Sequence, residues 1–538
     1  MTGGWWNENT SAIVKLVLAG ATLAVVAWDL ARRRRTTSTS TTTATAASAS
    51  AIGTALRVLG VLGLLAYFNF GSFHFGGIHV HLWDSLHHVL GAKYIDEIGY
   101  DRLYDCIAVA DAEDPETGPR AAQRVLTDLR TNQMTTAADV VAHPERCKAR
   151  FSGERWSDFK ADVAFFRARF PEADWQHLTS DHGFNASPVW LLIAHPLAGD
   201  DPLTITRVGV LAALDPLLML AAFAALAWAF GWERAALAAV VWGTYFPGRL
   251  WWTGGSFLRW DWLAALLAGL ALCRRERPFA GGALLGYAAL SRVFPVFALA
   301  GAGLAAVVAL VRRRKVDPAI VRLLGGAAVV TALLVPIAGA VRSGPGWSEF
   351  TRNLAKHTSV PSPNRMGLAA VVAFEPAATH RALERRHVDV RSQWQSSQAQ
   401  SLRDRRVLWV LLALLGAAAI ALAVRDQPAW AACVLGLLLV PLFRPLACYY
   451  YAFVAALPLA SERRADVAGI ALALALASGI VARMSGFGVD EQFAAQSLLV
   501  VLAFAFIASS FLGRRSAPAD ASGQFAPPRP PIGPPPSQ

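Results

Sequence analysis

Residues 51–88 read AIGTALRVLGVLGLLAYFNFGSFHFGGIHVHLWDSLHH, and the two ends of this stretch decide how the chain folds. The first part, Ala51–Phe70, is mostly apolar and carries a single charged residue, Arg57, and a helix needs about 20 predominantly apolar residues to cross a bilayer. The last part, His79–His88, carries four histidines and one aspartate. This order predicts a membrane helix that presents a functional segment at the membrane surface.

The rest of the chain repeats the apolar half of this pattern. Of 538 residues, 54% are hydrophobic and 16% are charged, whereas soluble domains carry roughly 25% charged residues. We expect an all-α polytopic membrane protein with about thirteen spanning helices. They lie near residues 11–31, 51–70, 203–229, 234–252, 260–273, 279–292, 294–311, 319–341, 407–424, 428–443, 446–460, 467–485 and 492–512.

All twelve histidines fall in two of the gaps between these spans. Nine lie in the gap at 71–202 and three in the gap at 342–406. Imidazole is the side chain that most readily exchanges protons near neutral pH and is also a common metal ligand. We therefore expect the chemistry of this protein on these two long loops.

Short basic clusters predict the orientation, because cytoplasmic loops are enriched in Lys and Arg. Arg32–Arg35 follow the first span, so that span is an anchor with its amino terminus outside and not a cleaved signal. If successive spans alternate in direction from this point, all the remaining basic clusters of the short loops lie in the cytoplasm, and both histidine loops lie outside. For a bacterial chain this predicts the inner membrane, with a site that faces the periplasm. The clusters are Arg274–Arg277, Arg312–Lys315, Arg463–Arg464 and Arg514–Arg515.

Composition divides the chain into four parts. Residues 1–35 form an appended anchor, and residues 36–50, almost all Thr, Ser and Ala, form a cytoplasmic linker. The membrane core follows at 51–513, and the Pro-rich residues 514–538 are expected to be a disordered cytoplasmic tail. The net charge of +12 reflects membrane topology, and we expect no nucleic-acid partner because no soluble basic domain carries the charge.

The first outer loop is too long to lack structure. Apolar spacing predicts amphipathic helices at 82–104, 121–132 and 155–170, lying at the membrane surface. The loop also holds Cys106 and Cys147, which an oxidising compartment would allow to form a disulfide, although the sequence leaves open whether they do.

The histidine patch allows three interpretations. On a helix that starts near Leu82, Asp84 and His88 share one face and His81 lies just before it. Asp84 is then a general base or cation-binding carboxylate supported by the imidazoles. Alternatively, the three residues bind a transition metal. In the third interpretation the helix is simply polar and its histidines are solvated.

A resemblance to a known family favours the first interpretation. Segment 83–105, WDSLHHVLGAKYIDEIGYDRLYD, is similar to the first outer loop of the GT-C glycosyltransferases, and so is 181–188, DHGFNASP, which precedes a span. Segment 253–295 resembles the core of the polyprenyl-phosphate-mannose-dependent mannosyltransferases, although that family more often has Lys where this chain has Arg292. Segments 350–367 and 445–458 also fit this pattern.

The resemblance implies a transferase that moves a sugar from a polyprenyl-phosphate donor to a membrane lipid or envelope glycan. It implies that Asp84 is the acid of the first loop, and it leaves open whether a divalent metal ion is needed. The residues that it marks as catalytic or substrate-binding are Asp84, Asp181, His81, His88, Asn185, Asp261, Asn364, Arg365 and Tyr450.

Guanidinium groups near the outer face are candidates for the donor phosphate, since Arg binds phosphate in a bidentate manner. Arg292 and Arg444 lie inside or at the ends of predicted spans, where an unpaired charge is costly, so a functional role is favoured for both. Arg249 and Arg259 lie beside tryptophans, so interfacial anchoring explains them equally well. Asp215 is either part of the site or a cap at the kink before Pro216.

Two other classes of protein remain alternatives. A transporter or flippase also places buried charges at broken helices, but the sequence shows no inverted repeat and carries large outer loops. A metal- or haem-handling membrane protein would use the loop histidines, but the chain has no CxxCH motif and no histidine in the middle of a span.

Overall fold

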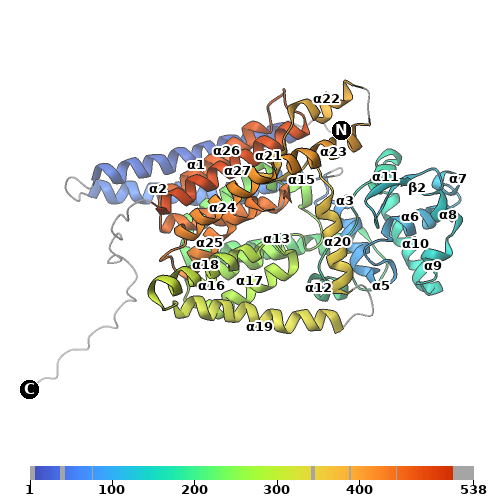
Figure 1. Cartoon of the computed structure of the whole chain (residues 1–538), viewed down its shortest axis with the longest axis horizontal. Coiled ribbons are helices and arrows are strands. Elements are labelled where there is room, and N and C mark those ends of the chain that lie inside the picture. Colours follow the sequence, from blue (N-terminus) through green and yellow to red (C-terminus); the bar gives the residue numbers. More distant parts are fainter. Residues whose placement is uncertain are drawn as a thin grey trace, which may run out of the picture.

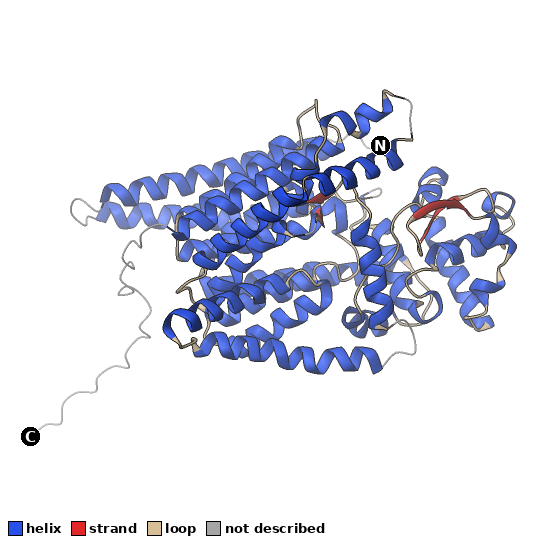
Figure 2. Cartoon of the chain, in the orientation of Figure 1, coloured by secondary structure: helices blue, strands red, loops and turns tan. Residues whose placement is uncertain are grey.

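The computed structural model describes residues 7–36, 43–74, 77–340, 346–386, 389–443 and 445–512. The chain is about 76% helical, and Figure 2 shows strands only as short pieces among helices. The expected Pro-rich tail and the candidate Arg444 lie outside the described residues.

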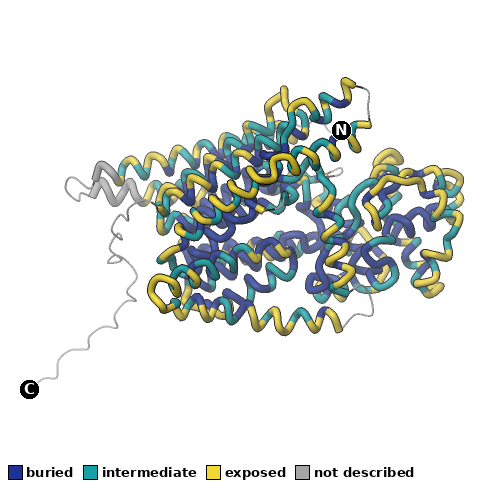
Figure 3. Tube along the Cα trace, in the orientation of Figure 1, coloured by how far each residue is buried: buried dark blue, intermediate teal, exposed yellow. Residues whose placement is uncertain are grey.

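Long apolar helices form the outer layer of the membrane body. Within the described residues, seven helices are long and apolar enough to cross a bilayer. Most of their side chains are not buried by the protein, and α24 and α19 expose rows of large aliphatic residues (Figure 3), as lipid-facing helices do. The seven are α1 (Glu8–Thr36), α2 (Thr43–Tyr67), α13 (Ile205–Phe230), α18 (Val296–Arg313), α19 (Pro318–Ala340), α24 (Arg406–Ala423) and α27 (Val489–Leu512).

Shorter apolar helices fill the interior. The other six predicted spans are helical too, but none exceeds 16 residues, so the α-helices among them reach at most about 24 Å. The thirteen expected spans are therefore confirmed only in part. Apolar residues surround these helices on every side, which is typical of buried helices. They are α14 (Trp232–Thr244), α16 (Asp261–Arg274), α17 (Pro278–Arg292), α25 (Ala429–Gly436) with η6 (Leu437–Leu442), η7 (Cys448–Glu462) and α26 (Asp466–Val481).

The first helix is part of this body. Helix α1 packs against α2, α14 and α26, and α2 already begins at Thr43. Part of the segment expected to be a linker, residues 43–50, is therefore helical. Residues 37–42 of that segment lie outside the described residues.

Both histidine-bearing segments lie at one end of the helical body. Figure 1 shows the region after α2 and the helices α20 (Trp347–Ser359), α22 (His380–Glu384) and α23 (Val390–Asp404) at the same end, while the end of α1 and the start of α2 lie at the opposite end. A short antiparallel pair, β3 (Arg365–Met366) with β4 (Leu446–Ala447), ties the second segment to the start of η7.

The first histidine-bearing segment, which follows α2, has a hydrophobic core of its own. Helix α10 (Gly153–Arg167) confirms the helix expected at 155–170, and it packs with α6 (Leu103–Ala112) and α11 (Glu172–Leu178). Phe159, Phe166 and Trp175 are fully buried there. The expected short helices therefore pack on one another, since separate helices would leave these aromatic rings in water.

The prediction of a helix at 121–132 is wrong. Residues 118–121 form one helical turn, and the chain then enters a hairpin, β1 (Val125–Asp128) paired with β2 (Gln133–Thr136). Val125 and Thr127 are β-branched and favour a strand, and Thr127 N–H also donates to Thr179 O at 2.8 Å. A disulfide joins Cys106 to Cys147 beside this hairpin.

Candidate functional site

The histidine patch begins with a capped helix. His81 precedes α3 (Leu82–Ser85), and its Nδ1 accepts the backbone N–H of Asp84 at 3.2 Å. Its Nε2 then carries the proton and donates to Trp251 O at 2.9 Å. Both nitrogens of His81 are therefore occupied, and the residue holds Asp84 in place.

The helix continues with one wide turn. Residues Leu86–Leu90 form a π-helical turn, η3, followed by α4 (Gly91–Lys93) and α5 (Ile95–Ile98). The helix expected at 82–104 is thus present as consecutive segments that end at Gly99. π-Turns occur frequently at functional sites, and this one presents His88 toward Asp84.

Asp84, His88 and Arg259 form a buried charged array. The Asp84 Oδ2 atom lies 3.0 Å from Arg259 Nε and 3.6 Å from His88 Nδ1. His88 Nδ1 donates to Asp84 O at 3.1 Å, so its Nε2 is free to accept Arg259 Nη1 at 2.7 Å. His88 is therefore neutral. The side chains of His88 and Arg259 are 4% exposed, while that of Asp84 is 15% exposed.

This setting keeps Asp84 ionised. Burial alone would raise the pKa of the Asp84 carboxyl, but the Arg259 guanidinium outweighs burial and holds that pKa below its ordinary value. Burial, reinforced by Arg259, lowers the pKa of His88 well below its ordinary value. At neutral pH the array is a carboxylate, a neutral imidazole and a guanidinium.

Asp215 fixes the backbone beside Arg259. Its Oδ2 accepts the backbone N–H of Arg259 at 2.7 Å and its Oδ1 that of Trp260 at 3.1 Å. The preceding residue, Leu258, has a left-handed backbone with φ 49°, which is costly for a branched side chain. Asp215 therefore positions the site through this loop, and is not only a cap at Pro216.

Arg292 approaches the same loop from α17. Its Nη2 donates to Leu258 O at 3.3 Å, and its Cζ lies 5.5 Å from the ring centre of Trp190. Its Nε is enclosed without a hydrogen-bond partner, and it forms no ion pair with any described residue. Asp261 lies nearby at the start of α16, where its Oδ2 accepts from Tyr287 and Ser291 and its Oδ1 has no partner.

Aromatic rings from η7 complete this side of the array. Arg259 Cζ lies 5.5 Å from the ring centre of Tyr449. Tyr450 packs against Tyr449 at 4.6 Å and against Phe294 at 5.2 Å. Tyr449, the residue before the predicted Tyr450, is therefore the tyrosine that contacts the Arg259 guanidinium.

Asp181 belongs to a second polar cluster. Its Oδ2 accepts from Trp83 Nε1 at 3.0 Å, and its Oδ1 accepts the backbone N–H of His182 at 2.7 Å. The His182 ring lies 5.9 Å from that of His357 on α20. Burial would raise the pKa of Asp181, but His87, His182 and these hydrogen bonds lower it below its ordinary value.

Helix α20 closes over this second cluster. Asn353 and His357 are four residues apart on one face of α20, and Asn353 Nδ2 donates to Phe184 O at 3.2 Å. His357 Nε2 and Asn353 Oδ1 are buried without hydrogen-bond partners. The sequence pointed to Asn353 only as part of the segment 350–367 that fits the resemblance, and to His357 only as one of the loop histidines. Their four-residue spacing on an amphipathic helix was a further usable signal. Predicted Asn185 is half-buried beside Phe184.

The remaining predicted residues lie apart from Asp84. Arg365 is in β3 and donates to His357 O, and Asn364 accepts from Ser362 at 2.8 Å. Arg249 pairs with Glu8 of α1 at 3.2 Å and stacks on Phe246. The structure therefore groups Arg259 and Arg292 with Asp84, and places Arg249 against the first helix.

The histidine ring nitrogens that could bind a metal ion beside Asp84 are already occupied by hydrogen bonds. His81 and His88 each use both ring nitrogens in hydrogen bonds. Among the residues that the structure describes, no three His, Cys, Asp or Glu side chains are arranged to hold a metal ion. The metal-binding interpretation of this patch gains no support.

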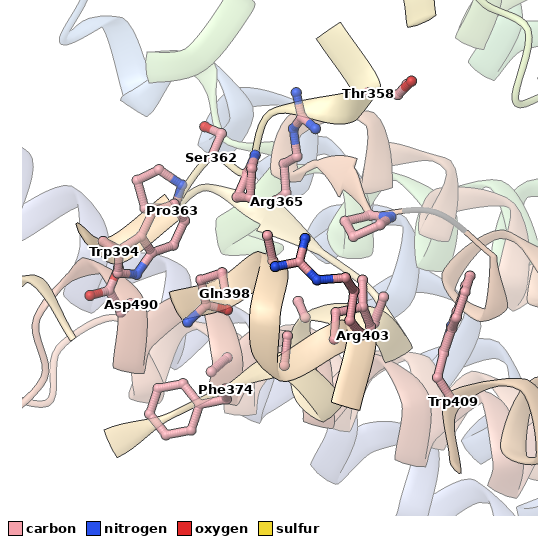
Figure 4. Close-up of a pocket in the computed structure, with 18 of the residues that line it drawn as sticks. Thr358, Ser362, Pro363, Arg365, Phe374, Trp394, Gln398, Arg403, Trp409 and Asp490 are labelled. Carbon is pink, nitrogen blue, oxygen red and sulfur yellow. The ribbon is translucent and has the colours of Figure 1, made fainter. Parts of the chain in front are cut away.

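A separate cavity of about 390 Å³ has Arg365 in its wall, and Asp84 does not line it. Figure 4 shows Arg365, Arg403 and Gln398 turned toward it, with Trp394 and Trp409 on opposite sides. Its walls come from α23, the start of α24 and α21 (Leu368–Ala373).

No family model, no curated protein and no solved structure matches this chain. The geometry of the site therefore carries the functional assignment.

Proposed function

We propose that this protein is a membrane glycosyltransferase that moves a sugar from a polyprenyl-phosphate donor to an acceptor hydroxyl on the outer face of a bacterial inner membrane. The observation that carries the proposal is the array of Asp84, His88 and Arg259, with Arg292 beside it. The array combines an ionised carboxylate with a guanidinium group that has unused hydrogen-bond donors, and it lies at the end of an apolar helical body.

Asp84 takes the acceptor proton in this proposal. Its Oδ2 is enclosed against Arg259, which leaves Oδ1 for the acceptor hydroxyl. As the hydroxyl oxygen bonds to the anomeric carbon of the sugar, the bond from that carbon to the phosphate oxygen breaks and the proton passes to Asp84. Such a base typically contributes about 100- to 10,000-fold to the rate.

Arg292 stabilises the phosphate that leaves. It forms no ion pair with the described residues, and its terminal nitrogens donate only to Ser291 O at 3.4 Å and Leu258 O at 3.3 Å, so they have donor capacity left for phosphate oxygens. A buried guanidinium without a counter-charge is costly, and a phosphate would supply that charge. Arg259 is already paired with Asp84, which makes it the residue that positions the base.

A transporter or flippase is the second candidate, because broken helices meet buried charges here. The first outer segment argues against it, since its core and disulfide make a rigid cap of the kind that holds an enzyme site. Reporter fusions after residue 35 and within 110–150 test the proposed outward orientation. A cytoplasmic signal from the second fusion would remove the basis of the proposal.

The decisive experiment measures sugar transfer from a radiolabelled polyprenyl-phosphate sugar in membranes that contain the protein. Asp84→Asn should lower the rate by about 100-fold or more while membrane insertion stays normal. Asp181→Asn is the matched comparison, because Asp181 is a half-buried carboxylate of the same segment whose pKa is also lowered. If Asp84→Asn keeps more than half of the activity and Asp181→Asn abolishes it, Asp181 is the base. Absence of transfer with every donor tested would favour the transporter.

A further inference from the structure

The cavity beside Arg365 has strongly positive walls. Three arginines line it. Arg365 from β3 and Arg403 from α23 are seen in Figure 4, and the third is Arg406 at the start of α24. Asp490 is the only acid among the described lining residues, and it is engaged by His380, whose Nδ1 lies 2.8 Å from Asp490 Oδ1. The cavity therefore carries about two unbalanced positive charges.

The same cavity offers an unused hydrogen-bond donor. Trp394 is 5% exposed and lines the cavity, and its Nε1 is enclosed without a partner. Leaving a buried donor unpaired costs about 1–3 kcal/mol. An acceptor-rich, anionic ligand would pair with the guanidinium groups, and it would also pair with this enclosed donor once the Trp394 ring turns toward the cavity.

Apolar residues form much of the remaining wall, together with the polar residues Thr358, Ser359, Ser362 and Gln398. The apolar residues come from α21, α23 and α27 and include Ala370, Phe374, Leu402 and Ala494. Arg406 is the first residue of a candidate membrane span, so the charged part of the cavity lies at the membrane boundary. The ligand is therefore an amphiphile with an anionic head and an apolar chain.

The cavity adjoins the Asp84 array but is separate from it. None of Asp84, Arg259 and Arg292 lines it. Arg365 forms the connection, because its side chain donates to His357 O beside Asp181 and it also lies within electrostatic range of Tyr449.

We infer that this cavity binds the phosphomonoester head group of an isoprenoid phosphate, the carrier that remains after the sugar has left. This inference rests on the proposed function. A phosphomonoester carries a charge of about −1.5 to −2 at pH 7, which matches the excess of guanidinium groups, whereas a phosphodiester head group carries only one negative charge.

The test measures direct binding and needs no turnover. Farnesyl phosphate is titrated into the detergent-solubilised full chain, and phosphatidylglycerol is used as the phosphodiester competitor. The double variant Arg403→Gln/Arg406→Gln should weaken binding by about 10-fold or more for each lost charged hydrogen bond. Trp394→Phe keeps the ring, removes the donor, and should weaken binding about 3- to 10-fold.

Arg385→Gln is the matched control. Arg385 lies in the same outer segment and is exposed, and its Nε donates to Arg381 O away from the cavity lining. Equal weakening by this control would reveal a general charge effect and overturn the inference. So would equal competition by phosphatidylglycerol, or undiminished binding to the double variant. Binding that behaves as expected in a protein without transferase activity would uphold the cavity and refute only the proposed function.

Discussion

Removing the charge of Asp84 should destabilise the protein as well as inactivate it. In Asp84→Asn, the Arg259 guanidinium stays 4% exposed and loses its anion. Two unit charges about 4 Å apart attract by about 4 kcal/mol at an effective dielectric constant of 20, and breaking a buried pair costs about 3–5 kcal/mol. The amide still accepts a hydrogen bond, so we expect a loss of about 3 kcal/mol.

A second substitution separates stability from catalysis. Arg259→Gln in the Asp84→Asn background removes the unpaired charge, and replacing both members of a buried ion pair is often nearly neutral. The apparent unfolding midpoint in detergent should therefore recover in the double variant, while sugar transfer stays abolished. Asp200→Asn is the control, because its ion pair with Arg155 has a carboxylate that is 87% exposed, and such pairs contribute about 0–1 kcal/mol. An unchanged midpoint in Asp84→Asn, or activity restored in the double variant, would refute this account.

Arg292→Lys keeps the charge but loses the planar fork, so transfer should fall about 10-fold or more with normal insertion, and full activity in Arg292→Ala would place the phosphate elsewhere. Non-reduced peptide mass spectrometry should find Cys106 linked to Cys147, and free alkylation of both thiols in native membranes would disprove the bridge. The pKa of Asp84 is lowered, so the carboxylate is still charged at its unfolded-state pKa of about 3.9. The stability that this charge contributes is fully present above that pH and is lost as the pH falls through the lower, folded-state pKa. The rate should therefore show no acid limb from Asp84 between about pH 8 and pH 5; a limb near pH 6 that disappears in Asp84→Asn would contradict the lowered pKa.

The sequence predicted the helical positions well, because apolar runs report burial in lipid or protein directly. It did not separate the long outer helices from the short inner ones such as α16, because both kinds are equally apolar. The hairpin at Val125–Asp128 was missed because its partner strand and Thr179 are contacts that local periodicity does not record.

For the site, the four-residue spacing correctly brought His88 next to Asp84, because helix geometry is local. The partner of Asp84 was less predictable. Arg259 lies far along the chain, and its neighbouring tryptophan favoured interfacial anchoring equally. Only the fold separates Arg259 from Arg249, whose partner is Glu8 of the first helix.

The short inner helices also set the depth of the site. Helices α16 and α17 have 14 and 15 residues and span about 21–22 Å, whereas the hydrocarbon core is about 30 Å thick. If the basic ends of these helices are level with one membrane surface, the ends that carry Asp261 and Arg292 lie about 8 Å below the opposite surface. The longer helices α13 and α19 pack on α16 and α17 and face the lipid, so the bilayer keeps its thickness and these short ends form the floor of a recess inside the protein. A lipid head group would have to leave the plane of the membrane surface and bend down into this recess to reach Arg292 and Asp84.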